Sequence, residues 1–108
     1  MDLQNHFSDG ELESIIEEAC LYMCACPGQL AKEIRGLRSL IRYQRDCISE
    51  GNTLENVHRT IEASAREAHA VMEACLAQVL ELEQWDRKTL KMPPGLRQLR
   101  DTLVNEPE

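Results

Sequence analysis

Apolar side chains recur every three or four positions along most of the chain, and no segment shows the strict alternation of a β-strand. This spacing is the period of an amphipathic helix. It predicts an all-α protein, an antiparallel helical bundle of three main helices followed by a short C-terminal helix. We expect these helices over about residues 9–26, 27–50, 53–91 and 94–104 of a single domain, residues 1–108.

Capping signals mark the first two helix boundaries. Ser8 and Glu11 have the spacing of a capping box, in which each side chain accepts a hydrogen bond from the other residue's backbone amide. Phe7 and Leu12 occupy the two positions of a hydrophobic staple. Pro27 disfavours helix at the residue before it and suits the first position of a new helix, so we expect the chain to turn there.

The third predicted helix is the longest. Gly51 is a natural left-handed stop for the helix before it, and Asn52 with Glu55 fits a second capping box. Neither Gly nor Pro interrupts the following residues until Pro93. The pattern therefore allows one continuous helix, with a break near Trp85 as the alternative.

A seven-residue repeat runs through this third helix. The repeat consists of Leu54, Ile61, Ala68, Cys75 and Leu82, and its stripe is widened by Val57, Ala65, Val71, Met72 and Val79. Such a repeat favours packing against other helices at a shallow angle. Because the first helix is much shorter than the third, part of the third helix lacks cover within one chain. We therefore expect a symmetric homodimer.

Composition agrees with a small helical domain that gains from self-association. The chain has 108 residues, of which 43% are hydrophobic and 4% aromatic, so aliphatic side chains must fill the core. A domain of this size buries a modest fraction of its surface. The net charge of −7 opposes binding to nucleic acid or to an anionic membrane. No apolar run approaches the length of a membrane span, so we expect neither partner.

The cysteine content and the N-terminus predict a cytoplasmic protein. The five cysteines are an odd number, and a periodic helical domain needs no disulfide staples. The first residues contain no basic segment followed by an apolar one, so we expect no secretory signal.

Three cysteines lie close together at the predicted turn between the first two helices. With short connections, the third helix would run back past this turn and place Cys75 beside it. Cys20, Cys24, Cys26 and Cys75 are thus candidate ligands for zinc, copper(I) or an iron–sulfur cluster. Their spacing matches no strong metal motif. The favoured expectation is that no cofactor binds and that the thiols pack as small hydrophobes.

A redox role is the alternative for the same cysteines. Cys26 precedes the second helix, where unpaired amides and the helix dipole stabilise a thiolate, and Cys24 is placed to resolve it. The first 26 residues carry six acidic residues and no Lys or Arg, and this negative charge opposes a thiolate.

The histidines offer weaker candidates for chemistry. Glu55 and His58 have the spacing of an iron-ligand pair in carboxylate bundles, but Arg66 stands where a second pair, ending at His69, needs a carboxylate. We expect His69 to be exposed. Cys47 with His58 is the one weak nucleophile–base pair. The sequence contains no phosphate-binding loop or hydrolase motif, so we do not expect an enzyme.

A basic stripe follows one edge of the second helix. Arg35, Arg38, Arg42 and Arg45 recur in steps of three and four, and Lys32 extends the row. Rows of guanidinium groups can bind phosphates. At this net charge, the favoured expectation is pairing with the acidic first helix or with the glutamates of a protein partner. These arginines are the candidate interaction residues.

The segment from Ile34 to Cys47 begins Ile-Arg-Gly-Leu-Arg-Ser-Leu-Ile-Arg. It resembles part of the helical metal- and formaldehyde-sensing repressors of the copper-sensor family. The resemblance implies a small all-α, self-associating protein with Cys and His ligands. It covers residues 34–47 alone. Those repressors open directly into this helix, whereas an acidic helix with cysteines precedes it here.

These patterns favour one class of function over two others. The leading interpretation is a small cytoplasmic, self-associating helical protein that acts through protein–protein interaction, with regulation as one role. The first alternative is a thiol-based metal-binding or redox-sensing protein that uses the cysteine cluster. The second is a helical metal-responsive repressor.

Overall fold

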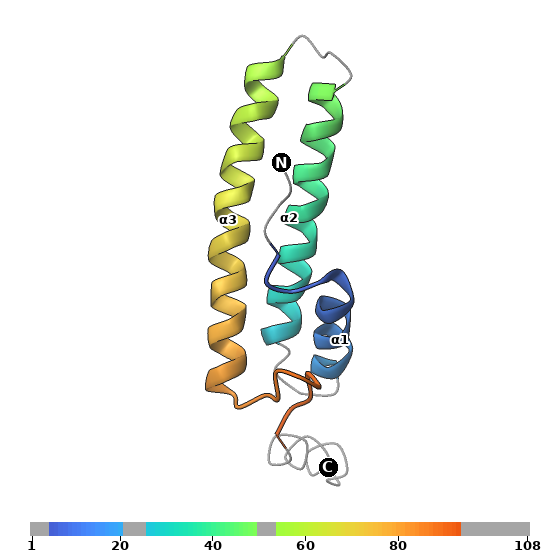
Figure 1. Cartoon of the computed structure of the whole chain (residues 1–108), viewed down its shortest axis with the longest axis vertical. Helices are drawn as coiled ribbons and strands as arrows, with labels where there is room; N and C mark the ends of the chain where they lie inside the picture. Colours follow the sequence, from blue (N-terminus) through green and yellow to red (C-terminus); the bar gives the residue numbers. More distant parts are fainter. Residues whose placement is uncertain (1–4, 21–25, 50–53, 94–108) are drawn as a thin grey trace, which may run out of the picture.

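The computed structural model describes residues 5–20, 26–49 and 54–93, and these ranges contain three α-helices. α1 is Asp9–Ala19, α2 is Cys26–Ser49 and α3 is Glu55–Leu82. α2 and α3 form a long antiparallel hairpin, and α1 packs beside the N-terminal half of α2 (Figure 1). The predicted all-α class is confirmed for these ranges. The predicted C-terminal helix over 94–104 lies outside them.

α1 begins where its capping residues predict. The Ser8 hydroxyl accepts from the Glu11 amide at 3.0 Å, and the Glu11 carboxylate accepts from the Ser8 amide at 2.9 Å. The staple residues Phe7 and Leu12 are both fully buried. α1 ends at Ala19, earlier than the predicted end at residue 26.

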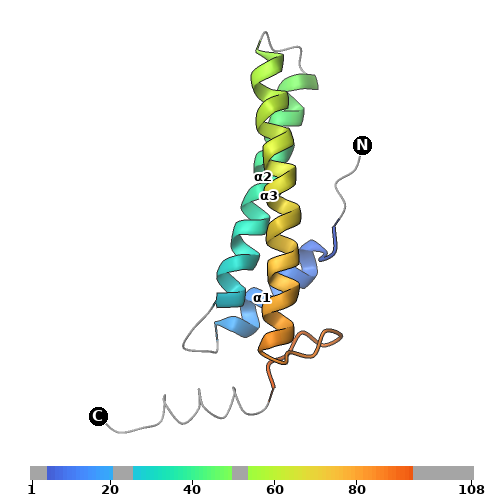
Figure 2. The ribbon, with the colours of Figure 1, turned by 90° about the vertical axis from the view of Figure 1, so that its left-hand side faces the viewer.

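α2 is the central helix. It contacts both α1 and α3, whereas α1 makes no direct helix-to-helix contact with α3 among the described residues. Figure 2, a side view, shows the long hairpin with α1 set against one side of it. Residues 5–8 and 85–92, which precede α1 and follow α3, make the links between these two helices.

The hydrophobic core lies at the end of the hairpin where α1 packs. It combines residues of all three helices with residues from the two linking segments: Phe7, Leu12, Ile15, Ala19, Ala31, Ile34, Leu76, Leu80, Trp85, Leu90 and Met92. All of them are at most 5% exposed. The packed part of the domain is therefore confined to one half of the hairpin.

α1 and α2 approach closely at Gly28. A Cβ atom on Gly28 would lie 2.9 Å from the Cβ of Ala19, which is closer than two carbon atoms can approach. Glycine at this position lets the backbones approach, and Ala19 is consequently almost fully buried. The short first helix is thus seated directly on the first turns of α2.

α3 begins at Glu55, with Leu54 at the N-cap position and no side-chain capping bond. The capping role predicted for Glu55 is wrong. It is the first residue of the helix, and its carboxylate pairs with Arg59 at 2.8 Å. The other half of that predicted box, Asn52, lies outside the described residues.

α3 ends at Leu82 rather than near residue 91, so the alternative of a break near Trp85 is the closer prediction. The helix stops because Gln84 adopts a left-handed conformation, with φ of 62°. None of the described helices has a stretch that is apolar and long enough to cross a bilayer.

A tight turn after Trp85 closes the core. The Asp86 carboxylate accepts hydrogen bonds from the backbone amides of Thr89 and Lys88, and these bonds lower the pKa of Asp86. Asp86 and Lys91 also pair as an isolated antiparallel bridge. The turn brings Met92 back against α1.

Candidate interaction face

The seven-residue repeat of α3 lies along the edge of the hairpin rather than in its core. We call the following residues the α3 seam: Leu54, Val57, Ile61, Ala68, Val71, Cys75 and Leu82. Four of them expose half or more of their surface, up to 75% for Leu82. The buried face of α3 is a neighbouring row: Ala65, His69, Glu73, Leu76 and Leu80.

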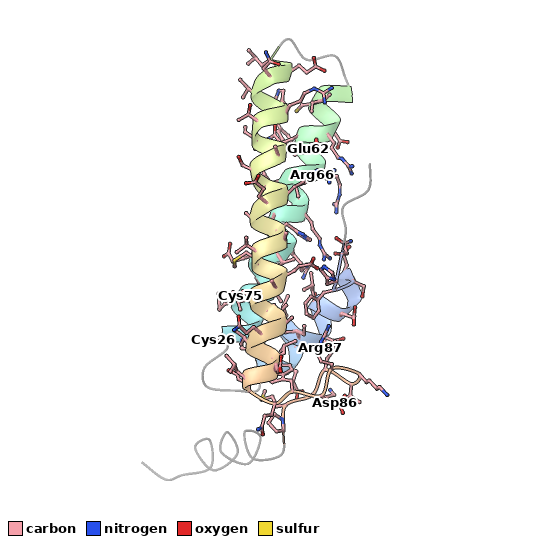
Figure 3. All side chains as sticks on the ribbon, turned by 60° about the vertical axis from the view of Figure 1, so that its left-hand side comes forward. Cys26, Glu62, Arg66, Cys75, Asp86 and Arg87 are labelled. Carbon is pink, nitrogen blue, oxygen red and sulfur yellow. The ribbon has the colours of Figure 1, made fainter. Side chains whose placement is uncertain are left out.

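The α3 seam points away from α1. Residues two positions apart on a helix differ by about 200° in direction. Val71 and Cys75 therefore point away from Glu73, which bonds the segment that leads into α1. Figure 3 shows Cys75 on the side of the hairpin away from α1, whereas Arg87 lies on the side of α1. Among the described helices, α2 alone packs against α3, and it leaves Val57, Val71 and Leu82 exposed.

The part of the hairpin farther from the hydrophobic core buries few apolar side chains. We call residues 35–49 and 55–75 the distal half. Its buried hydrophobic residues, among those described, are Ile41 and Ala65. A helix that packs on a core ordinarily buries three or four apolar residues in every two turns. The distal half thus falls well short of a self-sufficient core.

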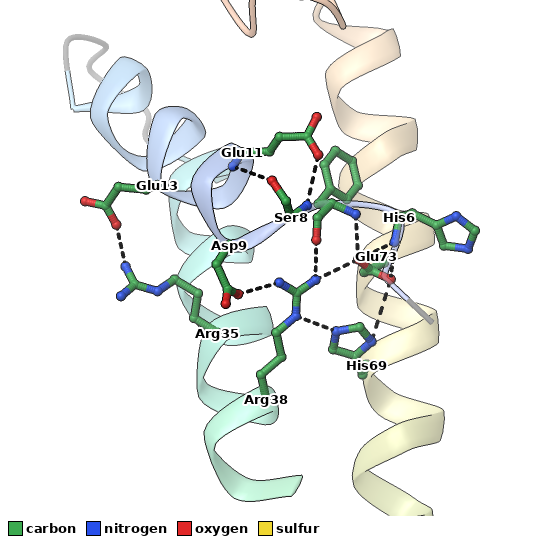
Figure 4. A network of polar contacts seen from close by, with 10 residues as sticks. His6, Ser8, Asp9, Glu11, Glu13, Arg35, Arg38, His69 and Glu73 are labelled. Atoms are coloured by element: carbon green, nitrogen blue, oxygen red, sulfur yellow. Dashed lines mark hydrogen bonds and ion pairs between the residues drawn. The ribbon is translucent and has the colours of Figure 1, made fainter. Parts of the chain in front are cut away.

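A buried carboxylate joins the N-terminal segment to α3 (Figure 4). Glu73 is 1% exposed. Its carboxylate accepts hydrogen bonds from the backbone amides of His6 and Phe7, each at 3.0 Å, and from the guanidinium of Arg38, also at 3.0 Å. Because a buried charge requires partners of this kind, Glu73 fixes where residues 5–8 run.

Arg38 is the cationic centre of the same network. It is 6% exposed, and its guanidinium donates in four directions. Besides Glu73, the acceptors are the Phe7 carbonyl at 2.5 Å, the Asp9 carboxylate at 2.7 Å and Nε2 of His69 at 2.9 Å. The network therefore ties α2 to the start of α1 and to α3 at once.

His69 completes the network as a neutral ring. Its side chain is 1% exposed, and burial lowers its pKa. The negative charge of Glu73 opposes this shift, while the positive charges of Arg38 and His6 add to it. Since Nε2 accepts from Arg38, we assign the proton to Nδ1, which lies 3.6 Å from a Glu73 oxygen. The predicted exposure of His69 is wrong. The face of α3 that is buried within the chain contains His69 and lies next to the heptad row of Ala68.

A second buried carboxylate holds the other end of α1. Glu18 is 2% exposed, accepts a hydrogen bond from the Met92 amide at 2.8 Å and lies 3.6 Å from the Lys91 ammonium. At the first end, the Arg87 guanidinium stacks 4.3 Å from the centre of the Phe7 ring. These contacts hold α1 on the side of the hairpin opposite the α3 seam.

Most of the basic stripe pairs within the chain. Arg35 lies 2.6 Å from Glu13, and Arg38 is bound in the buried network. Arg45 is 3.8 Å from Glu62 of α3. Arg42 forms no ion pair within the described ranges. Pairing with the acidic first helix is therefore confirmed for Arg35 and Arg38, while contact of the stripe with a partner stays a prediction.

The cysteines of the described ranges form no disulfide bond with one another. Cys20 and Cys26 are exposed, Cys47 and Cys75 are half-buried, and Cys24 lies outside the described residues. The hairpin is antiparallel, as the prediction for Cys75 requires, and Figure 3 shows Cys26 and Cys75 toward the same end of it. No group of three or more potential ligands among the described residues is arranged to hold a metal ion. The four-thiolate site remains a prediction that depends on Cys24.

His58 bonds an amide. Its Nδ1 lies 2.6 Å from Oε1 of Gln44, and its Nε2 is buried without a hydrogen-bond partner. The ring is therefore engaged with Gln44 rather than with the thiol of Cys47. The Glu55 carboxylate, the other member of the predicted iron-ligand pair, lies 2.8 Å from Arg59.

Glu18 and Glu73 were not identified from the sequence. The position of each residue in the sequence nevertheless indicates that it lies on a buried helix face. Glu73 lies four positions after His69 and three before Leu76, so it shares the buried row of α3, and Glu18 directly precedes the buried Ala19. A carboxylate inside an apolar row can indicate a buried structural charge.

The chain was compared with family models, curated proteins and solved structures, and none of them matches it. The burial, contacts and charges of its own residues are the observations that bear on its function.

Proposed function

We propose that the chain is a non-enzymatic cytoplasmic interaction protein that pairs with a second copy of itself through the α3 seam. The observation that carries this proposal is the contrast between the two halves of the hairpin. The half beside α1 contributes to a packed core, whereas the distal half buries Ile41 and Ala65 and exposes Val57 and Val71. Removing such apolar surface from water contributes about 25 cal/mol per Å².

The order of side chains along α3 favours a second copy as the partner. Leu54 and Leu82 each lie 14 positions from Ala68, and Ile61 and Cys75 each lie seven positions from it. Val57 has a matching valine 11 positions beyond Ala68. In an antiparallel pair with its two-fold axis at Ala68, Leu54 would face Leu82, Val57 would face the second valine, and the two copies of Ala68 would face each other. A patch that complements itself in this way is what a two-fold dimer requires.

Side-chain size along the α3 seam suits such a pair. Ala68, at the centre, is small enough for two helix backbones to approach closely, and the leucines at both ends are large. The heptad spacing keeps the contact row in register over the 28 positions from Leu54 to Leu82, about 42 Å of helix. Two hairpins joined along this length would bury the distal halves in a four-helix arrangement.

The exposed cysteines support a reducing compartment for this protein. Cys20 and Cys26 are exposed, and no disulfide bond joins the cysteines of the described ranges. Exposed thiols persist in the cytoplasm, where they are kept reduced.

Sedimentation equilibrium tests the proposal. At about 100 μM, the full chain should have twice the mass of one copy. Helical interfaces of this length usually have dissociation constants below that concentration. Val71→Glu places a charge in the α3 seam and should give a monomer. Ala63→Glu is the matched control, since Ala63 is exposed on a different face of α3, and it should leave the mass unchanged.

Two results would overturn the dimer. The first is a wild-type monomer at about 100 μM, which would show that the α3 seam is not the interface of a stable homodimer. The second is equal dissociation by Val71→Glu and Ala63→Glu, which would show a general effect of charge on α3.

A further inference from the structure

A groove of about 420 Å³ lies between the N-terminal end of α1 and the middle of α2. α2 contributes Lys32, Arg35, Gly36, Ser39 and Arg42 to its lining, and two carboxylates of α1 form the opposite wall. This volume is within the range of sites for small molecules. The lining is rich in cationic groups although the whole chain has a net charge of −7.

The charges in this groove are only partly neutralised. Arg35 pairs with Glu13 at 2.6 Å, and Arg38 pairs with Asp9 at 2.7 Å, so these four groups form fixed walls. Two cations of the lining remain. Lys32 and Arg42 make no ion pair or side-chain hydrogen bond within the part of the chain that the structure describes.

Gly36 lines the groove and lies between these two cations in the sequence of α2. Glycine weakens the interior of a helix relative to alanine, so its presence there needs a reason. Packing does not provide one, because no atom lies within 4 Å of the place where a Cβ would stand. This openness contrasts with the crowding at Gly28 of the same helix. The consequence of glycine at this position is an open groove.

We propose that this groove binds a small ligand with two or more phosphoryl groups. Lys32 and Arg42 would supply its cationic contacts, and the Ser39 hydroxyl would donate a hydrogen bond between them. The two cations are ten positions apart, about 15 Å along α2, and both have long flexible side chains. That separation suits a ligand with more than one phosphoryl group. The carboxylates of Asp9 and Glu13 limit the site to a short anion.

Isothermal titration calorimetry on the full chain at low salt tests this site with three probes: inorganic pyrophosphate, ATP and adenosine. Pyrophosphate and ATP should bind, and adenosine should not. Binding should weaken at about 500 mM salt, because salt screens exposed charges. Binding of ATP without pyrophosphate would identify a nucleotide as the source of the phosphoryl groups. Binding of both would identify the polyphosphate itself.

Three variants locate the binding. Arg42→Gln should weaken affinity about tenfold, the effect of one lost charge-assisted hydrogen bond. Arg59→Gln, an exposed arginine of α3 outside the groove, should leave affinity unchanged. Gly36→Leu should fill the groove and abolish binding while the thermal midpoint stays equal or rises. Val71→Glu should bind as the wild type does, so failure of the dimer would not affect this site.

Several outcomes would overturn the proposal. They are the absence of heat with both phosphate probes at millimolar concentration, an equal loss of affinity in Arg42→Gln and Arg59→Gln, and wild-type binding by Gly36→Leu. Heat from a polyglutamate peptide with none from the phosphate probes would also overturn it.

Discussion

The buried carboxylate of Glu73 accepts a 3.0 Å hydrogen bond from the backbone amide of Phe7, a residue 66 positions earlier in the chain. Arg38 bonds both residues, through its contacts to the Glu73 carboxylate and to the Phe7 carbonyl. One side chain of α3 therefore fixes the segment that leads into α1. This contact accounts for the placement of α1 on one side of the hairpin and for the α3 seam being left open on the other.

Glu73→Ala should destabilise the fold by about 3–5 kcal/mol, because it leaves the buried Arg38 charge without its main partner. Urea unfolding at fixed protein concentration measures this change. Glu67→Ala, at an exposed position of the same helix, is the matched control and should stay within about 0.5 kcal/mol. Similar losses in both variants would contradict the structural role of the network.

The free energy of unfolding should fall as the pH drops below about 6.5. The pKa of His69 is lowered, first by burial, so the unfolded chain binds a proton at higher pH than the folded chain does. Glu73 opposes the shift, and Arg38 and His6 add to it. Urea midpoints between pH 8 and pH 5 measure the effect, a window that spans the ordinary histidine pKa of about 6.5. His69→Gln should flatten part of the profile, and an unchanged profile would contradict this account.

Two glycines of α2 should respond to alanine with opposite signs. Gly28→Ala should destabilise by about 1–3 kcal/mol, because its Cβ would meet that of Ala19 at 2.9 Å. Gly36→Ala should stabilise by about 0.5–1 kcal/mol, because the new methyl group enters open space and alanine favours helix. Thermal unfolding of the two variants provides the comparison. A loss of stability in Gly36→Ala would contradict the open environment at that position.

Much of the helical architecture could be predicted from the sequence, because the signals that determine it are local. The capping box of Ser8 and Glu11 and the turn at Pro27 depend on residues within one or two turns of each other. The end of α3 was harder to predict. Its stop depends on a left-handed conformation at Gln84, a residue type with no strong preference for that region.

The polar network could not be predicted in the same way. The sequence predicts Arg38 only as one member of a basic row that pairs with carboxylates, and it predicts His69 to be exposed beside the heptad. Their burial results from residues 5–8 crossing to α3, and that path is set by long-range contacts rather than by helical period. The heptad itself was correctly identified, yet the face that packs within the chain is the adjacent row of α3.

The rate of thiol alkylation should differ between Cys75 in the α3 seam and the exposed cysteines. Cys20 and Cys26 should alkylate rapidly in the native protein, and Cys75 slowly, because the dimer covers it. Iodoacetamide labelling mapped by mass spectrometry measures each rate. Val71→Glu should accelerate labelling of Cys75 alone. Equal rates for Cys75 in both proteins would contradict its place in the interface, whereas protection of Cys20 and Cys26 would favour the metal-binding alternative.

The distance between two identical spin labels tests the antiparallel dimer most directly. The measurement uses a chain in which alanine replaces the native cysteines, with its dimeric mass confirmed first, and carries Ala68→Cys or Leu82→Cys as the labelled site. Labels at position 68 should lie within about 20 Å of each other, and labels at position 82 about 42 Å apart along the helices, twice 14 positions of 1.5 Å rise. Short distances at both positions would indicate a parallel pair, and the absence of dipolar coupling at both would indicate no pair; either result would contradict the account.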